Sequence, residues 1–236
     1  MNKEEFIENC KLLNINITED IYNKLNTYYE LLIEWNNKFN MTTIVDKKDV
    51  FLLHFYDSLC LTKIGNLNNY KNICDFGTGA GFPGLVISII FSDLKVTLIE
   101  SNNKKCTFLN NVKEKLNLNN VIIINDRMEN YSLKNKEKFD LITCRAVTSI
   151  PIILELSIAA LKTNGLLVPL KSNCDDEIIK YKYLEKELNI ELINKIDYTL
   201  PINKANRTIP IYKKINKTSD KYPRSFNKIL KDYKNK

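Results

Sequence analysis

The chain has 236 residues, enough for one domain of about 200 residues with a sizeable core and an appendage. Its six cysteines form no CxxC pair and several lie in apolar runs, which argues against a disulfide framework and predicts reduced core thiols. The charged start and the lack of any apolar run near ~20 residues argue against a membrane span and predict a cytoplasmic protein.

The net charge of +7 is unevenly placed along the chain. Residues 204–236 carry eleven Lys/Arg and two Asp, a local charge of +9, which leaves −2 for residues 1–203. A strong local positive charge favours a polyanionic partner. A solvated, partly disordered tail would explain the same charge equally well.

Residues 1–65 are predicted to form a helical extension. Thr18 is a suitable N-cap, and apolar residues recur with a helical period from position 21 to position 39. A third helix is expected over 46–61, where His54, Asp57 and Ser58 fall at i, i+3 and i+4 and so share one face. These three are either site residues or a hydrogen-bonding cluster that docks the helix on the next domain.

From residue 72 short apolar segments alternate with helical ones, which predicts an α/β domain over 66–217 with a mostly parallel sheet covered on both faces. Strands are expected over 72–76, 95–100, 120–124, 138–144 and 164–170, and helices over 83–91, 103–117, 149–162 and 175–188. Segments 190–199 and 207–215 are expected to form an antiparallel hairpin at the sheet edge. Residues 218–236 are expected to be a basic tail, and the last dozen show no strong periodicity.

Four of the six glycines lie in Asp75-Phe76-Gly77-Thr78-Gly79-Ala80-Gly81-Phe82-Pro83-Gly84, between a predicted strand and a predicted helix. Glycines in such a turn permit positive φ and let the backbone approach a ligand closely. No Lys-Ser or Lys-Thr pair ends the turn, which argues against a phosphate-binding P-loop. The turn also satisfies GxGxxG, a pattern that dinucleotide-binding proteins share.

Glu100 ends the second predicted strand, where its two oxygens can accept from both ribose hydroxyls of an adenosine. Such a carboxylate serves NAD and S-adenosylmethionine equally. Asp75 before the turn can pair with the ammonium group of S-adenosylmethionine, and no set of residues suited to binding a nicotinamide follows. S-adenosylmethionine is therefore favoured. Asp126 is an alternative acid for the adenine side.

Four further motifs accompany the glycine turn: Asn40-Met41-Thr42, His54-Phe55-Tyr56-Asp57-Ser58-Leu59, Cys144-Arg145-Ala146-Val147 and Tyr222-Pro223-Arg224. Together they resemble the bacterial RsmG (GidB) family over residues 35–224, and the Phe-Pro-Gly ending of the turn is typical of that family. The resemblance implies a class I (Rossmann-like) methyltransferase that uses S-adenosylmethionine to methylate N7 of a guanine in 16S ribosomal RNA.

The resemblance implies cofactor contacts at Gly77, Phe82, Met128, Glu129 and Arg145. Gly79 in the turn and Glu100 at the end of the second strand are the other expected cofactor-binding residues. Ligands in open α/β sheets bind outside the carboxyl ends of the strands, which is where these residues are expected.

Guanine N7 carries a lone pair and no proton, so its methylation requires no general base and no catalytic acid–base pair is predicted. Rate should come from holding N7 in line with the S–methyl bond, an effect worth up to ~7–11 kcal/mol in favourable models. His54, Asp57 and Ser58 are candidates for positioning, and Asp57 for a position near the positive charge of the product. No metal is expected.

Basic and aromatic residues suited to phosphate contact and base stacking are Lys171, Arg207, Lys213, Lys214, Tyr222 and Arg224. The expected partner is small-subunit ribosomal RNA or the assembled 30S subunit, with the enzyme a monomer. After Arg224 the sequence departs from the usual ending of the family. The competing hypotheses are a nicotinamide-dependent oxidoreductase, a methyltransferase for another RNA or a small molecule, and a non-catalytic ribosome-binding module.

Overall fold

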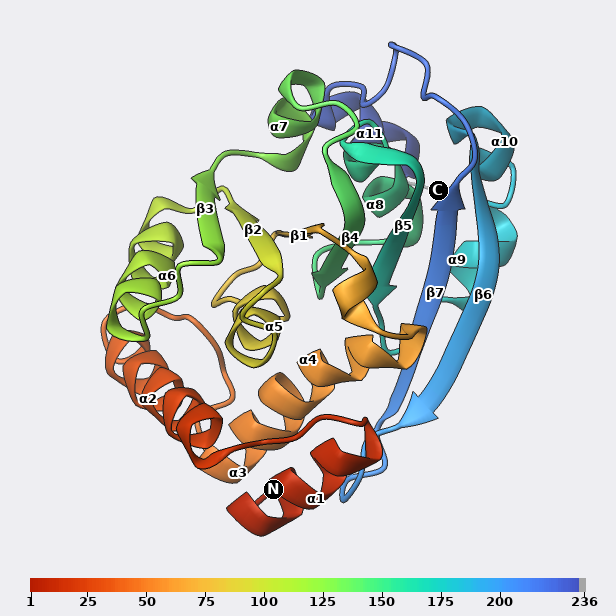
Figure 1. Cartoon of the computed structure of the whole chain (residues 1–236). Coiled ribbons are helices and arrows are strands. Elements are labelled where there is room, and N and C mark those ends of the chain that lie inside the picture. The colour runs from red at the N-terminus through yellow and green to blue at the C-terminus, as the bar shows by residue number, and fades with distance from the viewer. Residues whose placement is uncertain (234–236) are drawn as a thin grey trace.

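A seven-stranded sheet in the order β3-β2-β1-β4-β5-β7-β6 forms the centre of the computed structural model, which describes residues 1–233 (Figure 1). The strands are β1 (Asn72–Phe76), β2 (Lys95–Glu100), β3 (Val121–Asn125), β4 (Phe139–Arg145), β5 (Leu161–Leu170), β6 (Ile190–Thr199) and β7 (Asn206–Lys214). The first five are parallel, and β7 pairs antiparallel with both β5 and β6. The predicted fold class, with its antiparallel edge hairpin, is confirmed.

Two hydrophobic clusters cover the two faces of the sheet. Successive strand residues point to opposite faces, so Ile73 of β1 joins one cluster and Cys74 joins the other. The first cluster holds residues of α5 (Gly84–Ile90), α6 (Asn103–Lys115) and the N-terminal extension. The second holds residues of α7 (Met128–Lys134), α8 (Ile150–Ser157), α10 (Leu184–Leu188) and α11 (Phe226–Tyr233).

The N-terminal extension consists of α1 (Lys3–Leu12), α2 (Glu19–Asn36), α3 (Lys47–Val50), a π-helical turn η1 (Phe51–Tyr56), α4 (Asp57–Leu59) and two 3₁₀ turns, Cys60–Ile64 and Leu67–Asn69. Thr18 caps α2, as predicted, by accepting from the Ile21 amide. Figure 1 shows α2 beside α5 and α6 and α4 beside α5, while α1 lies farther out, against η1.

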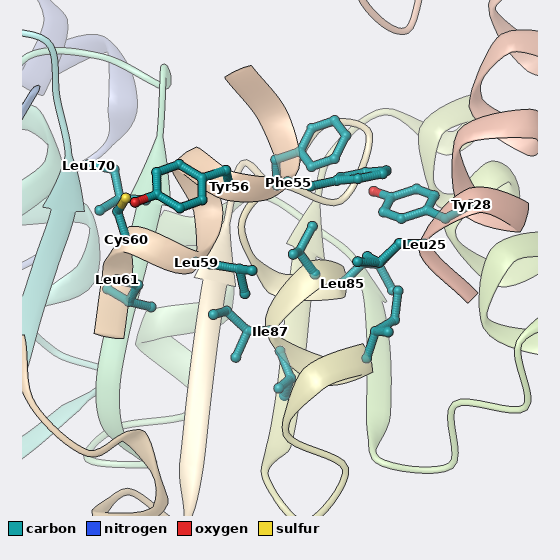
Figure 2. Packing of buried hydrophobic residues seen from close by; sticks show 14 of the residues in the cluster. Leu25, Tyr28, Phe55, Tyr56, Leu59, Cys60, Leu61, Leu85, Ile87 and Leu170 are labelled. Atoms are coloured by element: carbon teal, nitrogen blue, oxygen red, sulfur yellow. The ribbon is translucent and has the colours of Figure 1, made fainter. Parts of the chain in front are cut away.

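The extension shares its core with the sheet domain. Figure 2 shows Tyr28 of α2 beside Phe55 of η1, with Leu85 of α5 below them, and the two rings stack with centroids 5.3 Å apart. The Tyr28 hydroxyl donates to the carbonyl of Ala80 in the glycine turn. Packing of the extension therefore bears directly on the geometry of that turn.

Three helical regions differ from the sequence predictions. α7 was not predicted, and α11 lies where no strong periodicity was recognised. α11 has only eight residues, too few for its apolar positions to repeat more than twice, yet Ile229 and Tyr233 are buried in the second cluster. The predicted helix over 175–188 is divided into α9 (Asp175–Lys180) and α10.

All six cysteines are buried and none forms a disulfide, as predicted. No helix within residues 1–233 is both long and apolar enough to cross a membrane.

Candidate active site

The glycine turn runs from the carboxyl end of β1 to the start of α5, with left-handed backbone at three glycines. Gly77 has φ +61°, and a Cβ there would lie 2.8 Å from Cγ2 of Val147. Gly81 has φ +102°, and a Cβ there would lie 2.5 Å from both Leu85 Cδ1 and the Tyr28 hydroxyl. Only glycine satisfies both constraints, so the turn lies tightly against β4 and the extension.

The Asp75 side chain holds the turn in place through two hydrogen bonds. Its Oδ2 accepts from the Gly84 amide at 2.7 Å and from the Thr78 hydroxyl at 2.5 Å, and no described residue donates a hydrogen bond to the buried Oδ1. Burial raises the pKa of Asp75 to about 7, against the lowering effect of those two hydrogen bonds. The sequence interpretation of Asp75 as the partner of a ligand ammonium is corrected, because the side chain is fully buried and holds the loop.

Glu100 joins the turn to the end of β2. Its Oε2 accepts from the Gly79 amide at 2.9 Å and its Oε1 from the Asn102 amide at 2.7 Å. Each carboxylate oxygen has a further lone pair, so these contacts leave acceptor capacity for a ligand hydroxyl. The carboxylate is thereby fixed in orientation at the carboxyl end of the sheet.

A cavity of about 140 Å³, here called the β1–β3 cavity, lies at the ends of β1, β2 and β3, where Ile99 and Ser101, the neighbours of Glu100 in sequence, line it. Gly77, Met128 and Glu129 line it, three of the predicted cofactor positions. Its floor is apolar, with Ile99 and Val147, and Asp126 supplies a carboxylate. An apolar slot with acidic groups that can accept from an amine and from hydroxyls fits the adenosine part of S-adenosylmethionine.

A larger cavity of about 520 Å³, here called the β4–β5 cavity, lies at the ends of β4 and β5. His54, Asp57, Arg145, Lys171 and Arg207 line it. The structure thus brings together two positioning candidates, one residue expected on the cofactor side and two expected to bind RNA. Ser58 does not reach this cavity, because it is buried and its hydroxyl donates to the His54 carbonyl at 2.5 Å.

Asp57 is the centre of a hydrogen-bond network that joins the extension to the sheet. Arg207 Nε donates to Asp57 Oδ1 at 3.1 Å and to Oδ2 at 3.0 Å, and the Tyr198 hydroxyl donates at 3.3 Å. Arg145 Nη1 lies 3.4 Å from Asp57 Oδ2 and donates to the Leu53 carbonyl at 3.0 Å. One carboxylate from α4 therefore holds side chains from β4, β6 and β7, as the docking interpretation predicted.

His54 is held as a neutral imidazole by its surroundings. Its ring stacks on Phe82 at a centroid distance of 4.4 Å, and Arg145 Nη2 lies 3.1 Å from Nδ1. A guanidinium only donates, so Nδ1 accepts and Nε2 carries the proton toward the Thr42 hydroxyl 2.9 Å away. Burial and the Arg145 charge lower the pKa of His54 to about 3.

The segment Arg145-Ala146-Val147 separates the two cavities. Ala146 lines the β4–β5 cavity and Val147 lines the β1–β3 cavity. Ala146 has φ +54°, a left-handed conformation that costs a non-glycine residue roughly 1 kcal/mol or more. The two cavities therefore take wall residues from adjacent positions of one strained segment.

Comparison with known proteins agrees with this geometry. A family model described as rRNA small subunit methyltransferase G (GidB) matches residues 21–207. This chain belongs to the rRNA small subunit methyltransferase G family. Proteins named ribosomal RNA small subunit methyltransferase G from Mycoplasma capricolum and Bacillus subtilis are 45% and 39% identical, the first with 94% of this chain and 95% of its own covered, the second with 95% of each.

Solved structures outside the methyltransferase G family share the fold. The M. jannaschii TYW2 structure in complex with AdoMet aligns with a TM-score of 0.56 at 17% identity, over 73% of this chain and 80% of that one. An S-adenosylmethionine-dependent methyltransferase from Aquifex aeolicus aligns with a TM-score of 0.51 at 16% identity, over 71% and 93%. The family uses S-adenosylmethionine, and the residues around the β1–β3 cavity fit that cofactor.

Three residues predicted to bind RNA in this methyltransferase G family member are engaged in packing instead. The Lys214 ammonium is buried and donates to the Ile158 and Leu161 carbonyls at 3.0 and 2.8 Å. Tyr222 is buried, and Arg224 pairs with Glu155 at 2.7 Å. Charge and aromaticity along a sequence do not reveal such partners, so these three positions are corrected to structural roles in this conformation.

The other basic candidates have accessible positions. Lys171 donates to the Thr148 carbonyl at 3.0 Å and lies 3.4 Å from Glu177 in the wall of the β4–β5 cavity, and Lys213 is half-buried. Sequence reasoning missed Glu177 and grouped Phe226 with the aromatic residues suited to RNA stacking, although Glu177 lines the β4–β5 cavity and Phe226 the β1–β3 cavity. No motif contained either residue, although each follows a predicted site residue by six or fewer positions.

Proposed function

We propose that this member of the methyltransferase G family transfers the methyl group of S-adenosylmethionine to N7 of a guanine in small-subunit ribosomal RNA. The observation that carries the proposal is that the cavity whose lining suits the cofactor and the larger cavity lined by Arg145, Lys171 and Arg207 take adjacent wall residues, Val147 and Ala146. Because the proposed substrate is ribosomal RNA, we propose that the enzyme acts in the cytoplasm.

The residues of the β4–β5 cavity suit a reaction without a general base. When bound, S-adenosylmethionine supplies an electrophilic methyl group. The N7 lone pair forms the new N–CH₃ bond while the S–CH₃ bond breaks, and the electron pair of that bond stays on sulfur. No proton moves, in agreement with a His54 that hydrogen bonds hold neutral and an Asp57 that two arginines engage.

The chain's own residues can orient the base. Guanine presents the O6 acceptor next to the N1–H and N2–H₂ donors. Lys171 Nζ and Glu177 Oε1, 3.4 Å apart in the cavity wall, offer a donor next to an acceptor in the same order. With O6 against Lys171, the adjoining N7 edge is left for the methyl group. The carboxylate of Glu177 also favours the positive charge that N7 methylation gives the base.

Transfer of labelled methyl groups tests the proposal. Purified protein, labelled S-adenosylmethionine and ribosomal subunits from a strain that lacks this methylation should give label in small-subunit RNA and none in large-subunit RNA. Naked 16S RNA in parallel distinguishes free RNA from the assembled 30S subunit, which we propose as the substrate. Binding of NADH without affinity for S-adenosylmethionine would favour the oxidoreductase hypothesis and contradict the proposal.

A matched pair of variants tests base recognition. Glu177→Gln removes the acceptor charge, and we expect kcat/KM for the RNA to fall roughly 5- to 100-fold, the discrimination expected for a bidentate base contact. The affinity for S-adenosylmethionine should not change. Asp176→Asn is the control, because the neighbouring Asp176 is exposed and lines neither cavity. Equal rates for both variants would remove Glu177 from the proposal.

A further inference from the structure

The C-terminal helix α11 contributes a residue to the β1–β3 cavity. Phe226, the first residue of α11, lines this cavity together with Gly77, Met128 and Glu129. Its ring is half-buried, and the Arg127 guanidinium carbon lies 5.5 Å from the ring centroid. α11 lies beyond residues 21–207, the part of the chain that the family model matches. One wall residue of the cavity therefore comes from a segment outside the matched region.

A buried ion pair fixes this segment in place. Arg224 donates from Nε and Nη2 to the two oxygens of Glu155, at 2.7 Å each, and from its backbone amide at 3.0 Å. The Glu155 side chain is fully buried in α8. Two parallel charge-assisted bonds hold a guanidinium in a fixed orientation. The backbone two residues before Phe226 is thus attached to the helix that carries Leu156, another residue of the cavity wall.

The rest of α11 is anchored as firmly. Arg224 Nη1 pairs with Asp232 at 2.5 Å, and Nη2 donates to the Tyr233 hydroxyl at 3.1 Å. Ile229 is fully buried in the second core cluster. The C-terminal end of α11 is therefore tied to Arg224, which lies two residues before Phe226, and Ile229 anchors the middle of the helix in the core.

The chemistry of the cavity defines what Phe226 meets. The cavity of about 140 Å³ is smaller than the roughly 300 Å³ at which ligand pockets usually begin, so it has room for a part of the cofactor such as a planar base. A planar purine gains most from an aromatic face or edge on one side and apolar side chains on the other. Phe226 supplies the aromatic wall, and Met128 and Ile99 supply apolar ones.

We infer that Phe226 is a cofactor-binding residue that contacts the adenine ring of S-adenosylmethionine. The Arg127 guanidinium packs against the Phe226 ring. The Arg224–Glu155 ion pair is the positioning element that holds Phe226 in place. This inference rests on the proposed use of S-adenosylmethionine at the β1–β3 cavity. It gives the basic C-terminal segment a role in cofactor binding in place of the RNA contact expected from its charge.

Calorimetric titration with S-adenosylhomocysteine and with adenosine tests the inference without measuring methyl transfer. Phe226→Ala should raise the Kd of both ligands by the same factor, roughly 5- to 100-fold, because both carry the adenine. Phe226→Tyr should keep the wild-type Kd. Lys228→Ala is the matched control, because Lys228 is an exposed residue of the same helix that does not line the cavity.

The outcomes separate the inference from the proposed function. An unchanged Kd in Phe226→Ala, or a rise for S-adenosylhomocysteine with none for adenosine, would overturn the adenine contact while leaving the function intact. Wild-type protein that binds neither ligand would instead contradict the proposed function. If Phe226→Ala unfolds, Phe226→Leu keeps the apolar packing without the aromatic face, and a wild-type Kd in that folded variant would overturn the inference.

Discussion

Asp57 offers the sharpest test of how the extension and the sheet domain form one site. Asp57→Asn keeps the size of the side chain and removes its charge, so two guanidinium groups lose their shared anion. The side chains are little exposed, at 4% for Asp57, 13% for Arg145 and 19% for Arg207. Removing one member of a buried ion pair costs about 3–5 kcal/mol. Residual water contact at the arginines moves the expected loss toward about 2–3 kcal/mol.

Urea denaturation measures this loss as a change in the free energy of unfolding. For a chain of this size about 2–3 kcal/mol corresponds to a decrease in Tm of roughly 4–12 °C. Trp35, the only tryptophan, lies on α2, so its fluorescence reports on the extension while circular dichroism reports on the whole fold. Asp49→Asn, an exposed aspartate on α3, is the control and should change the free energy by less than about 0.5 kcal/mol. A comparably small effect of Asp57→Asn would refute the docking role.

Three further predictions use other parts of the structure. Gly77→Ala should raise the Kd for S-adenosylhomocysteine at least about tenfold, because φ is +61° and the new Cβ would lie 2.8 Å from Val147; calorimetry that shows wild-type affinity would contradict this. The pKa of His54 is about 3 in the folded protein and 6.5 in the unfolded chain. Acidification between these pH values should therefore destabilise the wild type by up to about 1.4 kcal/mol per pH unit more than His54→Asn, and parallel stability curves would disagree. Lys214→Ala should lose about 1–3 kcal/mol of stability in urea while Lys213→Ala loses little, because only the Lys214 ammonium bonds buried carbonyls; equal losses would contradict the assignment.

The strands and the glycine turn were predictable because their signals are local. Each predicted strand overlaps an observed one, since short apolar runs between turns determine which segments enter a sheet covered on both faces. The glycines likewise marked the turn, where three of them adopt positive φ as the pattern requires.

The residues whose roles were predicted wrongly pair with partners that are distant in sequence. Arg207 and its partner Asp57 are 150 residues apart, and Arg224 and Glu155 are 69 apart. No periodicity or motif encodes which buried acid will receive a given arginine. The same holds for Lys214, whose neighbours in sequence made it look like part of a basic surface although its strand position points it into the core.

The position of methylation tests the central claim most directly. Small ribosomal subunits that lack the modification are incubated with the protein and S-adenosylmethionine, and the RNA is then cleaved chemically at 7-methylguanine and mapped. The account predicts one new cleavage at a single guanine of the small-subunit RNA, absent without the protein and absent without the cofactor. Methylation at another base atom, or label on protein in place of RNA, would contradict it.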